Sequence, residues 1–396
     1  MESLKDCRRY TWEEFDALDL QSKNILFQGG APTVFHTLNA EQFDRPTLDR
    51  LYHLTNIIRS ISKTKNGATY LANRLRDKRA MLYFAQASTR TYLSFKTACD
   101  IMGIQCTDVR DTSTSSEVKG ESFSDTIRTF SSYFDFVIMR HGEEKNAEHA
   151  AWVVNTSDRP VPILNAGSGK DQHPTQALLD IYTLRRSFDN AGGMKGKTIL
   201  MAGDLNRGRT VRSLAKLLCL FDGIKIIFSA PPGFGMRDDA LEYLNQRGVN
   251  YVTTEEFLPH LPEADAIYMT RIQDEHDKND GTTSKRSYAD FSLKEEHLSL
   301  LKPFCAILHP LPRRGELDPK IDNDPRAKYW RQERNGMWTR AALIAMTCGV
   351  EPQIQNYWRD LSLQASHTGI IQLPPTGNDE KIWLPLQRSM TNENFR

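Results

Sequence analysis

Short apolar runs of the length of buried β-strands recur along this chain, and most are followed by a polar cluster and then by helical spacing. Continuous apolar strands that alternate with helices are typical of parallel sheets covered by helices on both faces. The sequence therefore predicts an α/β protein. The runs are Met81–Phe84, Phe136–Met139, Pro162–Leu164, Thr198–Ala202, Ile224–Phe228, Ala266–Met269 and Ala306–Leu308.

A chain of 396 residues is long enough for more than one such domain. A helical stretch at Pro174–Arg186 precedes a glycine-rich break, after which a new apolar run begins. We expect this helix to lead from a first doubly wound parallel-sheet domain to a second. The helical stretch Arg340–Met346 has an apolar face that can pack back against the first domain. The expected units are an N-terminal extension at 1–40, a first domain at 41–183 completed by a helix at 338–350, a second domain at 184–337 and a C-terminal extension at 351–396.

Both ends of the chain carry apolar residues that predict docking against the domains. Near the N-terminus, Thr11 and Glu14 have the spacing of a helix capping box, and Trp12 and Phe15 give that helix an apolar face. The sequence Gly29–Pro32 then interrupts the pattern. The C-terminal extension is too apolar for a free tail, so we expect it to wrap over the body of the protein. Its apolar residues include Trp358, Ile370, Ile371, Trp383 and Leu384.

Charge and cysteine usage argue against several classes of partner. The chain has 51 basic and 50 acidic residues, so no overall charge attracts nucleic acid or a membrane surface. The six cysteines are scattered without a Cys-x-x-Cys pair, which favours free thiols in a reducing compartment over a disulfide framework or a metal cluster. No apolar run has the length of a membrane span, and residues 1–10 are unlike a secretory signal. We therefore expect a cytoplasmic protein.

Polar clusters follow the apolar runs, at the place where open parallel sheets bind ligands. Most of these clusters contain an arginine. One such arginine would be interpreted as a surface residue or half of an ion pair, whereas several that converge on one cleft indicate anionic ligands. The clusters are Ser88–Thr91, Arg140 with His141, His173 with Gln176, Asp204–Thr210, Arg271 with Gln273, and His309–Arg313.

The segment Ser88–Thr91 lies between a buried apolar run and a helical pattern that stops at Gly103. Its hydroxyls, the guanidinium of Arg90 and the free N–H groups of a helix start would together suit an anion of phosphate size. The alternative is that Ser88 only caps the helix and that Arg90 lies in solvent. Taken alone, the segment favours capping, and the other clusters must provide the support for a phosphate site.

Two nucleotide-binding interpretations compete at Gly203–Thr210. The segment is one residue short of a phosphate-binding P-loop and has Arg209 where that loop needs lysine, so it supports a nucleotide-hydrolysing enzyme only weakly. A dinucleotide fold would need an acidic residue after the next strand, which instead ends in Phe228–Pro231, so a dehydrogenase is disfavoured. The histidines also lack the paired spacing of a metal site; they are His141, His173, His276 and His309.

Taken together and in this order, the clusters resemble the aspartate/ornithine carbamoyltransferase family, and its aspartate branch in particular. The resemblance extends over about residues 36–350, and so many separated motifs in one order are highly specific. The matching segments are Ser88-Thr89-Arg90-Thr91, Ser115 with Lys119-Gly120-Glu121, Met139-Arg140-His141, His173-Pro174-Thr175-Gln176, Gly208-Arg209-Thr210, Met269-Thr270-Arg271-Ile272-Gln273 and His309-Pro310-Leu311-Pro312-Arg313.

The resemblance implies transfer of a carbamoyl group from carbamoyl phosphate to the amine of aspartate, an early step of pyrimidine synthesis, with neither a cofactor nor a metal. It implies that Ser88-Thr89-Arg90-Thr91 binds the phosphate. Arg140 and His173 resemble the residues that hold the phosphate and the carbonyl oxygen and polarise that carbonyl. The residues implied to hold the carbamoyl NH2 are Gln176, Pro310 and Leu311.

The same resemblance implies a homotrimer with shared active sites. Ser115 and Lys119 correspond to a loop that, in this family, reaches into the neighbouring subunit's site, where Lys119 would act in binding and catalysis. Whether a regulatory chain also binds is left open. The residues that resemble those binding the two carboxylates of aspartate are Arg209, Arg271 and Gln273, with Lys119 and Leu311 beside them. Arg271 would repel the cationic side chain of ornithine, whereas paired arginines suit a dicarboxylate.

Two departures from the family pattern concern domain closure. Gln86 stands where the family usually has glutamate, and His276 where aspartate-specific members usually have arginine. In those members the acid ties the domains together by pairing with arginines at the positions of Arg209 and His276. Gln86 offers only neutral hydrogen bonds, so we expect weaker or differently arranged closure, and Gln86→Glu with His276→Arg should then change aspartate affinity or turnover. The alternatives are a paralogue with a different amine acceptor and a regulatory homologue that binds carbamoyl phosphate with reduced activity.

Overall fold

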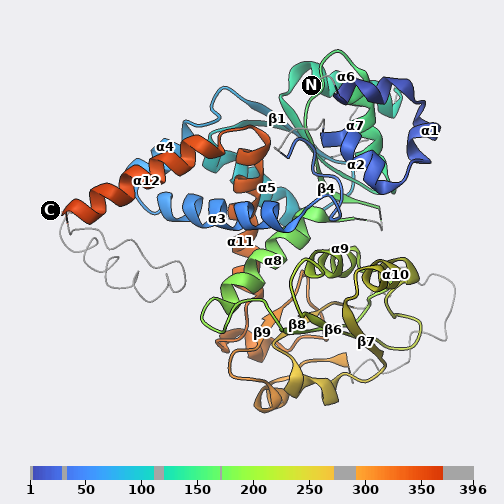
Figure 1. Ribbon diagram of the computed structural model, residues 1–396, viewed down its shortest axis with the longest axis vertical. Helices are drawn as coiled ribbons and strands as arrows, with labels where there is room; N and C mark the ends of the chain where they lie inside the picture. The colour runs from blue at the N-terminus through green and yellow to red at the C-terminus, as the bar shows by residue number, and fades with distance from the viewer. Residues whose placement is uncertain (1–2, 29–33, 111–119, 170–171, 272–290, 369–396) are drawn as a thin grey trace.

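Two parallel-sheet domains joined by two long helices make up the structure (Figure 1). The computed structural model describes residues 3–28, 34–110, 120–169, 172–271 and 291–368. The joining helices are α8 (Pro174–Phe188) and α11 (Tyr329–Thr347). The α/β architecture with two doubly wound sheets that the apolar runs predicted is confirmed.

The first sheet has four parallel strands in the order β2-β1-β3-β4. The elements of this domain are α3 (Arg45–Ile61), α4 (Lys65–Ala72), β1 (Arg79–Phe84), α5 (Thr89–Met102), β2 (Gln105–Val109), α6 (Phe123–Tyr133), β3 (Phe136–His141), α7 (Asn146–Thr156) and β4 (Ile163–Ser168). Because side chains alternate along a strand, Leu82 and Ile138 join one apolar cluster with α3 and α5, whereas Met81 and Val137 join another with α6 and α7. Helices therefore cover both faces of the sheet.

The second sheet has five parallel strands in the order β7-β6-β5-β8-β9. Its elements are β5 (Thr198–Ala202), α9 (Arg209–Leu218), β6 (Lys225–Ser229), α10 (Asp238–Gln246), β7 (Asn250–Thr254), η4 (Leu258–Glu263), β8 (Ala266–Met269), η8 (Glu295–Leu300), β9 (Ala306–Leu308) and η9 (Pro319–Asn323). Ile199 and Met201 face the cluster that also contains α8 to α11 and the first domain, so one apolar core runs through both domains. Leu200 and Ile267 face a separate cluster with the 3-10 helices.

Two of the four edge strands, β2 and β7, were not expected from the sequence. Both expose most of their side chains at least partly, and their sequences are polar, at Gln105–Val109 and Asn250–Thr254. An edge strand whose side chains face solvent does not need the apolar run on which the prediction depended. The other two edge strands, β4 and β9, are buried and were predicted. The seven strands that the sequence predicted are all present: β1, β3, β4, β5, β6, β8 and β9.

Each sheet contains one point at which the order of strand addition reverses, between β1 and β3 in the first sheet and between β5 and β8 in the second. Ligand crevices of open α/β sheets form outside the carboxyl ends of the strands at these points. The carboxyl ends of β1 and β3 carry Ser88–Thr91 and Arg140, and those of β5 and β8 lead to Arg209 and Arg271. The topology therefore places four of the arginine clusters at the two reversal points.

The N-terminal segment packs against α7 on the outer face of the first sheet (Figure 1). It consists of η1 (Ser3–Arg9), α1 (Trp12–Asp16) and α2 (Leu20–Gln28). The expected capping box is present, because the Thr11 hydroxyl accepts from the Glu14 N–H while the Glu14 carboxylate accepts from the Thr11 N–H. Phe15 and Phe27 are fully buried, which contributes about 2 kcal/mol each to docking. The break at Gly29–Pro32 lies outside the described residues.

Residues just before the expected boundary at 40 already join the first sheet. Thr37 forms a parallel bridge with Leu164 of β4. The buried ring of His36 accepts the Ile163 N–H at Nδ1 (2.9 Å), so its Nε2 carries the hydrogen and donates to Asn155 Oδ1 (3.1 Å). A neutral histidine thus connects the chain entering the domain to both β4 and α7.

At the other end, α12 (Glu351–Thr368) lies along α3 and α4 (Figure 1). Ile354 is fully buried, Trp358 packs on the core, and the ring of Tyr357 stacks on Tyr70 with centroids 3.7 Å apart. This part of the C-terminal extension covers the body as expected. The remaining apolar residues of the prediction lie outside the described residues: Ile370, Ile371, Trp383 and Leu384.

Helix α11 is longer than the predicted helix at 338–350, because it begins at Tyr329 and ends at Thr347. Its first half buries polar side chains, including Gln332 and Asn335, so it lacks the apolar periodicity by which the second half was recognised. None of the helices in the described ranges is long and apolar enough to span a membrane.

Candidate active site

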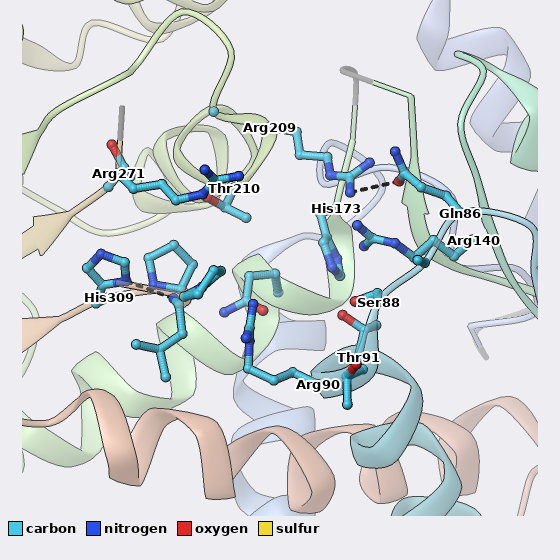
Figure 2. A pocket seen from close by; sticks show the side chains of 18 of the residues that line it. Gln86, Ser88, Arg90, Thr91, Arg140, His173, Arg209, Thr210, Arg271 and His309 are labelled. Carbon is cyan, nitrogen blue, oxygen red and sulfur yellow. Dashed lines mark hydrogen bonds between the residues drawn. The ribbon is translucent and has the colours of Figure 1, made fainter. Parts of the chain in front are cut away.

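A cavity of about 610 Å³ lies between the carboxyl ends of the two sheets (Figure 2). Every predicted substrate-binding residue that the structure describes lines it: Ser88, Thr89, Arg90, Thr91, Arg140, His173, Gln176, Arg209, Arg271, Pro310 and Leu311. The other predicted residues, Ser115, Lys119 and Gln273, lie outside the described residues, as does His276. The strand-end clusters that are described thus converge on one crevice.

The loop from β1 to α5 forms one wall of the cavity. Ser88 is the N-cap residue of α5 and has an extended backbone, but its side chain makes no capping hydrogen bond. The capping interpretation is therefore wrong for the hydroxyl, which instead faces the cavity together with the side chains of Arg90 and Thr91 (Figure 2). Hydroxyls, a guanidinium and the N-terminus of a 14-residue helix thus surround one point.

Arg140 and Arg209 meet across the two domains. Arg140, at the end of β3, donates from Nη1 to Ala166 O (3.2 Å). Arg209, the first residue of α9, donates from Nη1 to Gly169 O (2.5 Å). Its Nη2 donates to Gln86 Oε1 (3.2 Å), as Figure 2 shows. Gln86 therefore contacts the second domain through a hydrogen bond to its neutral amide oxygen, without an ion pair.

Gly167 allows these two guanidiniums to approach the first sheet. Its backbone has φ +122°, and a Cβ atom there would lie 2.7 Å from Arg140 Nη1 and 3.2 Å from Arg209 Cζ. A side chain would displace both arginines and strain the backbone. Sequence reasoning missed this glycine, because nothing in Asn165–Ser168 indicates which arginines will pack over it.

The cavity concentrates positive charge. Six arginines line it, with Glu333 as the one carboxylate among the described lining residues. Burial, together with repulsion from Arg209, Arg90 and Arg340, lowers the pKa of Arg140 to about 9. Burial also lowers the pKa of Arg209 to about 10. An anion between these groups would relieve their repulsion, so the site favours polyanionic ligands.

His173, the N-cap residue of α8, places a buried imidazole in the cavity. Burial, followed by repulsion from Arg209 and Arg140, lowers its pKa well below the ordinary 6.5, so the ring is neutral at physiological pH. Its Nδ1 has no hydrogen-bond partner among the described residues, and its backbone N–H donates to Ser213 Oγ (3.2 Å). A neutral imidazole can donate one ring hydrogen to a substrate oxygen without adding charge.

Residues after β9 form the opposite wall. Leu311 has the left-handed backbone angle φ +55°, rare for a residue with a side chain, and its N–H donates to His309 Nδ1 (2.7 Å). His309 Nε2 in turn donates to Glu316 (2.8 Å). Arg313 does not line the cavity. It pairs with Asp322 and Tyr329 instead, the ordinary ion-pair role that was considered for every strand-end arginine.

Helix α11 contributes residues that the sequence did not reveal. Arg340 is 3% exposed, donates from Nη1 to Ser94 Oγ (2.6 Å) and lies over the Phe95 ring at 4.8 Å. Gly336 leaves space for it, since a Cβ atom there would lie 2.7 Å from Arg340 Nη1. The sequence placed Arg340 only at the start of a helix with an apolar face, and no local signal distinguishes it from a surface arginine.

Nothing in the described residues gathers three metal-binding side chains of the His, Cys, Asp or Glu type. The segment Gly203–Thr210, considered as a P-loop, contributes Arg209 to the shared cavity at the start of α9. The arrangement can therefore hold two anionic ligand groups, one at the arginines of each sheet, with a neutral imidazole close by.

Comparisons with known proteins agree with this geometry. Residues 36–186 match the carbamoyl-phosphate-binding domain of the aspartate/ornithine carbamoyltransferase family, and residues 195–347 match its aspartate/ornithine-binding domain. Aspartate carbamoyltransferase 1, chloroplastic, of Pisum sativum is 35% identical over 332 residues, covering 83% of this chain and 82% of the pea protein. The aspartate carbamoyltransferase catalytic subunit of Chromobacterium violaceum is 38% identical over 272 residues, covering 69% and 86%.

A solved structure shares the fold. The crystal structure of aspartate transcarbamoylase from Trypanosoma cruzi in complex with carbamoyl phosphate and aspartate superposes with a TM-score of 0.71 and 35% sequence identity, covering 80% of this chain and 97% of that chain. Both family domains are thus matched in order, and relatives match most of the chain. The chain belongs to the aspartate/ornithine carbamoyltransferase family.

Proposed function

We propose that this protein transfers the carbamoyl group of carbamoyl phosphate to the amino group of L-aspartate, giving N-carbamoyl-L-aspartate and phosphate. The observation that carries the proposal is the single cavity at the reversal points of both sheets, with arginines from each. The similarity to aspartate carbamoyltransferases over most of the chain supports the same reaction. The product would enter pyrimidine synthesis.

The first domain would bind carbamoyl phosphate. Ser88–Thr91 and Arg140 supply hydroxyls, N–H groups and guanidiniums for the phosphate. The neutral ring of His173 and the guanidinium of Arg140 would donate to the carbonyl oxygen as it gains charge in the tetrahedral intermediate. The amine of aspartate attacks the carbonyl carbon, the bond from that carbon to the phosphate oxygen breaks, and the departing phosphate takes up the amine proton.

The second domain would bind aspartate. Arg209 and Arg271 reach the cavity from α9 and from the end of β8, and each guanidinium can hold a carboxylate by two hydrogen bonds (Figure 2). An acceptor with a cationic side chain would be repelled there. The charge of the cavity therefore favours a dicarboxylic amino acid over ornithine.

We further propose a cytoplasmic homotrimer with shared active sites, in which Lys119 acts in a neighbouring subunit's cavity. The match of Ser115 and Lys119 to a loop that, in this family, reaches a neighbouring subunit's site supports the trimer. The six thiols are free, which suits a reducing compartment.

Sedimentation equilibrium should give the mass of three chains. Mixed trimers of Lys119→Ala and Arg140→Ala chains should regain activity that neither variant has alone.

A steady-state assay tests the activity. With carbamoyl phosphate saturating, purified protein should release phosphate and form carbamoyl aspartate with L-aspartate, and should be inactive with ornithine. Turnover of another amine in preference to aspartate would identify a paralogue with a different acceptor. Binding of carbamoyl phosphate without turnover of any amine in the panel would identify a regulatory homologue, and either result would overturn the proposal.

A further inference from the structure

A buried carboxylate, Asp180, lies directly behind the cavity at the junction of the two domains. It is completely buried on α8, one helical turn after Gln176. Its Oδ1 accepts from Gln176 Nε2 (3.0 Å) and Gln332 Nε2 (2.7 Å), and its Oδ2 accepts from the Tyr268 hydroxyl (2.8 Å). Three elements, α8, α11 and β8, therefore meet at one side chain that does not itself line the cavity.

The orientation of the Gln332 amide is fixed by a donor that cannot be reversed. The backbone N–H of His309 donates to Gln332 Oε1 (2.9 Å). Because a backbone N–H is always a donor, the oxygen of this amide must face His309 and its Nε2 must face Asp180. Asp180 Oδ1 is therefore an acceptor, whatever the protonation of the carboxyl group at Oδ2.

The same reasoning fixes Gln176. Since Asp180 Oδ1 is an acceptor, the NH2 of Gln176 turns toward it. The amide oxygen of Gln176 then remains for the cavity, which this residue lines. Without Asp180, the amide would be free to rotate and to present donor or acceptor alike.

A second series of hydrogen bonds, the Gln332 branch, runs from Asp180 through Gln332 and His309 to Leu311 on the other wall of the cavity. His309, held by Gln332, accepts the Leu311 N–H at Nδ1 (2.7 Å). This bond restrains the left-handed turn at Leu311, whose backbone also lines the cavity. Burial raises the pKa of Asp180 to about 7, while its three donors favour the ionised form. One carboxylate thus anchors hydrogen bonds that reach both walls.

We propose that Asp180 is a positioning residue that makes the cavity select a carbamoyl group: it holds the Gln176 oxygen and the Leu311 backbone as acceptors for the substrate NH2. The inference rests on the proposed function and adds the determinant of donor-substrate specificity. An acetyl group has the same size and shape but carries CH3 in place of NH2. A fixed acceptor pair gains nothing from the methyl group and loses hydrogen bonds to solvent.

A pair of ligands isolates this effect. Phosphonoacetamide and acetonylphosphonate are stable and nearly isosteric, and they differ only in NH2 against CH3. Inorganic phosphate, which reaches the phosphate loop alone, serves as the reference ligand. By calorimetry the wild-type protein should bind phosphonoacetamide at least about tenfold more tightly than acetonylphosphonate, the effect of one good hydrogen bond.

Substitutions of Asp180 should change the ratio of the affinities for phosphonoacetamide and acetonylphosphonate without changing the affinity for phosphate. Asp180→Leu removes the acceptor at similar size, so the preference for the amide should fall about tenfold while phosphate affinity is unchanged. Asp180→Asn can keep its oxygen toward the glutamines and turn its NH2 to the Tyr268 hydroxyl, so it should retain most of the preference. Tyr268→Phe is the matched control, because it removes only the Oδ2 partner and should leave the ratio unchanged.

If Asp180→Leu does not fold, Gln332→Met breaks the branch to Leu311 alone and should reduce the preference several-fold, again without loss of phosphate affinity. An Asp180→Leu or Gln332→Met protein that loses all three ligands in parallel, or that keeps the wild-type ratio, would overturn the proposal for Asp180. A wild-type protein that lacks the preference and forms no carbamoyl aspartate would instead overturn the proposed function.

Discussion

The chemistry of the site at the level of single residues depends on like charges held close together. Burial and three neighbouring arginines lower the pKa of Arg140. The repulsion among these buried charges is unfavourable, and a bound anion would offset it. Burial and repulsion from Arg209, Arg140 and Arg340 lower the pKa of His173, so its ring stays neutral and can donate to an oxygen. Anion binding and carbonyl polarisation therefore have the same physical origin.

Substitution of single arginines should separate the two substrates. Arg90→Ala removes the guanidinium of the phosphate loop and should lower kcat/KM for carbamoyl phosphate by roughly 10²–10³. Arg271→Ala should mainly raise the KM for aspartate, by about 10–100-fold, since it removes one charged contact to a carboxylate. Initial rates with each substrate varied in turn provide the measurement. Equal effects of both substitutions on both substrates would contradict the assignment.

Sequence reasoning found the residues that carry obvious chemistry at strand ends, such as Arg90, Arg140 and Arg271. It could not find Gly167, whose role depends on two arginines from distant segments that pack over it. It also passed over Asp180, which looks like an exposed helix residue until Gln332 is folded against it. Contacts made only by tertiary structure leave no local pattern.

Helices and strands with buried apolar side chains were predicted from the sequence more accurately than exposed or polar ones. Central strands such as β5 and β8 matched their apolar runs residue for residue, because both faces are covered. The edge strands β2 and β7 and the polar first half of α11 were missed, since their residues face solvent or a polar network. The N-terminal helix α1 was found because its capping box and apolar face are both local signals.

The segment that enters the first domain should make stability depend on pH. Burial lowers the pKa of His36 from 6.5 to about 4. The unfolded chain therefore binds a proton that the folded chain does not, and stability falls as pH drops from 6.5 to about 4. The effect is at most about 3 kcal/mol, at 1.36 kcal/mol for each pH unit.

Thermal denaturation across this pH range measures the effect. The midpoint temperature of the wild-type protein should fall more steeply between pH 6.5 and 4 than that of His36→Gln, which has no ionisable ring. The buried His173 remains in both proteins, so the difference between the two curves isolates His36. Parallel curves would show that His36 does not contribute.

At the scale of the whole molecule, the site exists only where the two sheets face each other. The first sheet provides Ser88–Thr91 and Arg140 at its reversal point, and the second provides Arg209 and Arg271 at its own. Helices α8 and α11 and a shared apolar core fix the two sheets relative to each other. The order of strands could not be read from the sequence, although the convergence of the strand-end clusters on one crevice was predicted.

Calorimetric titration with N-(phosphonacetyl)-L-aspartate, which joins a phosphonate to aspartate, tests the central claim that one cavity binds both substrates between the domains. The account predicts one ligand per chain, bound far more tightly than phosphate or aspartate alone, and weakened by Arg90→Ala and by Arg209→Ala alike, because the ligand spans both sheets. Binding no tighter than that of phosphate, or binding that Arg209→Ala leaves unchanged, would contradict it.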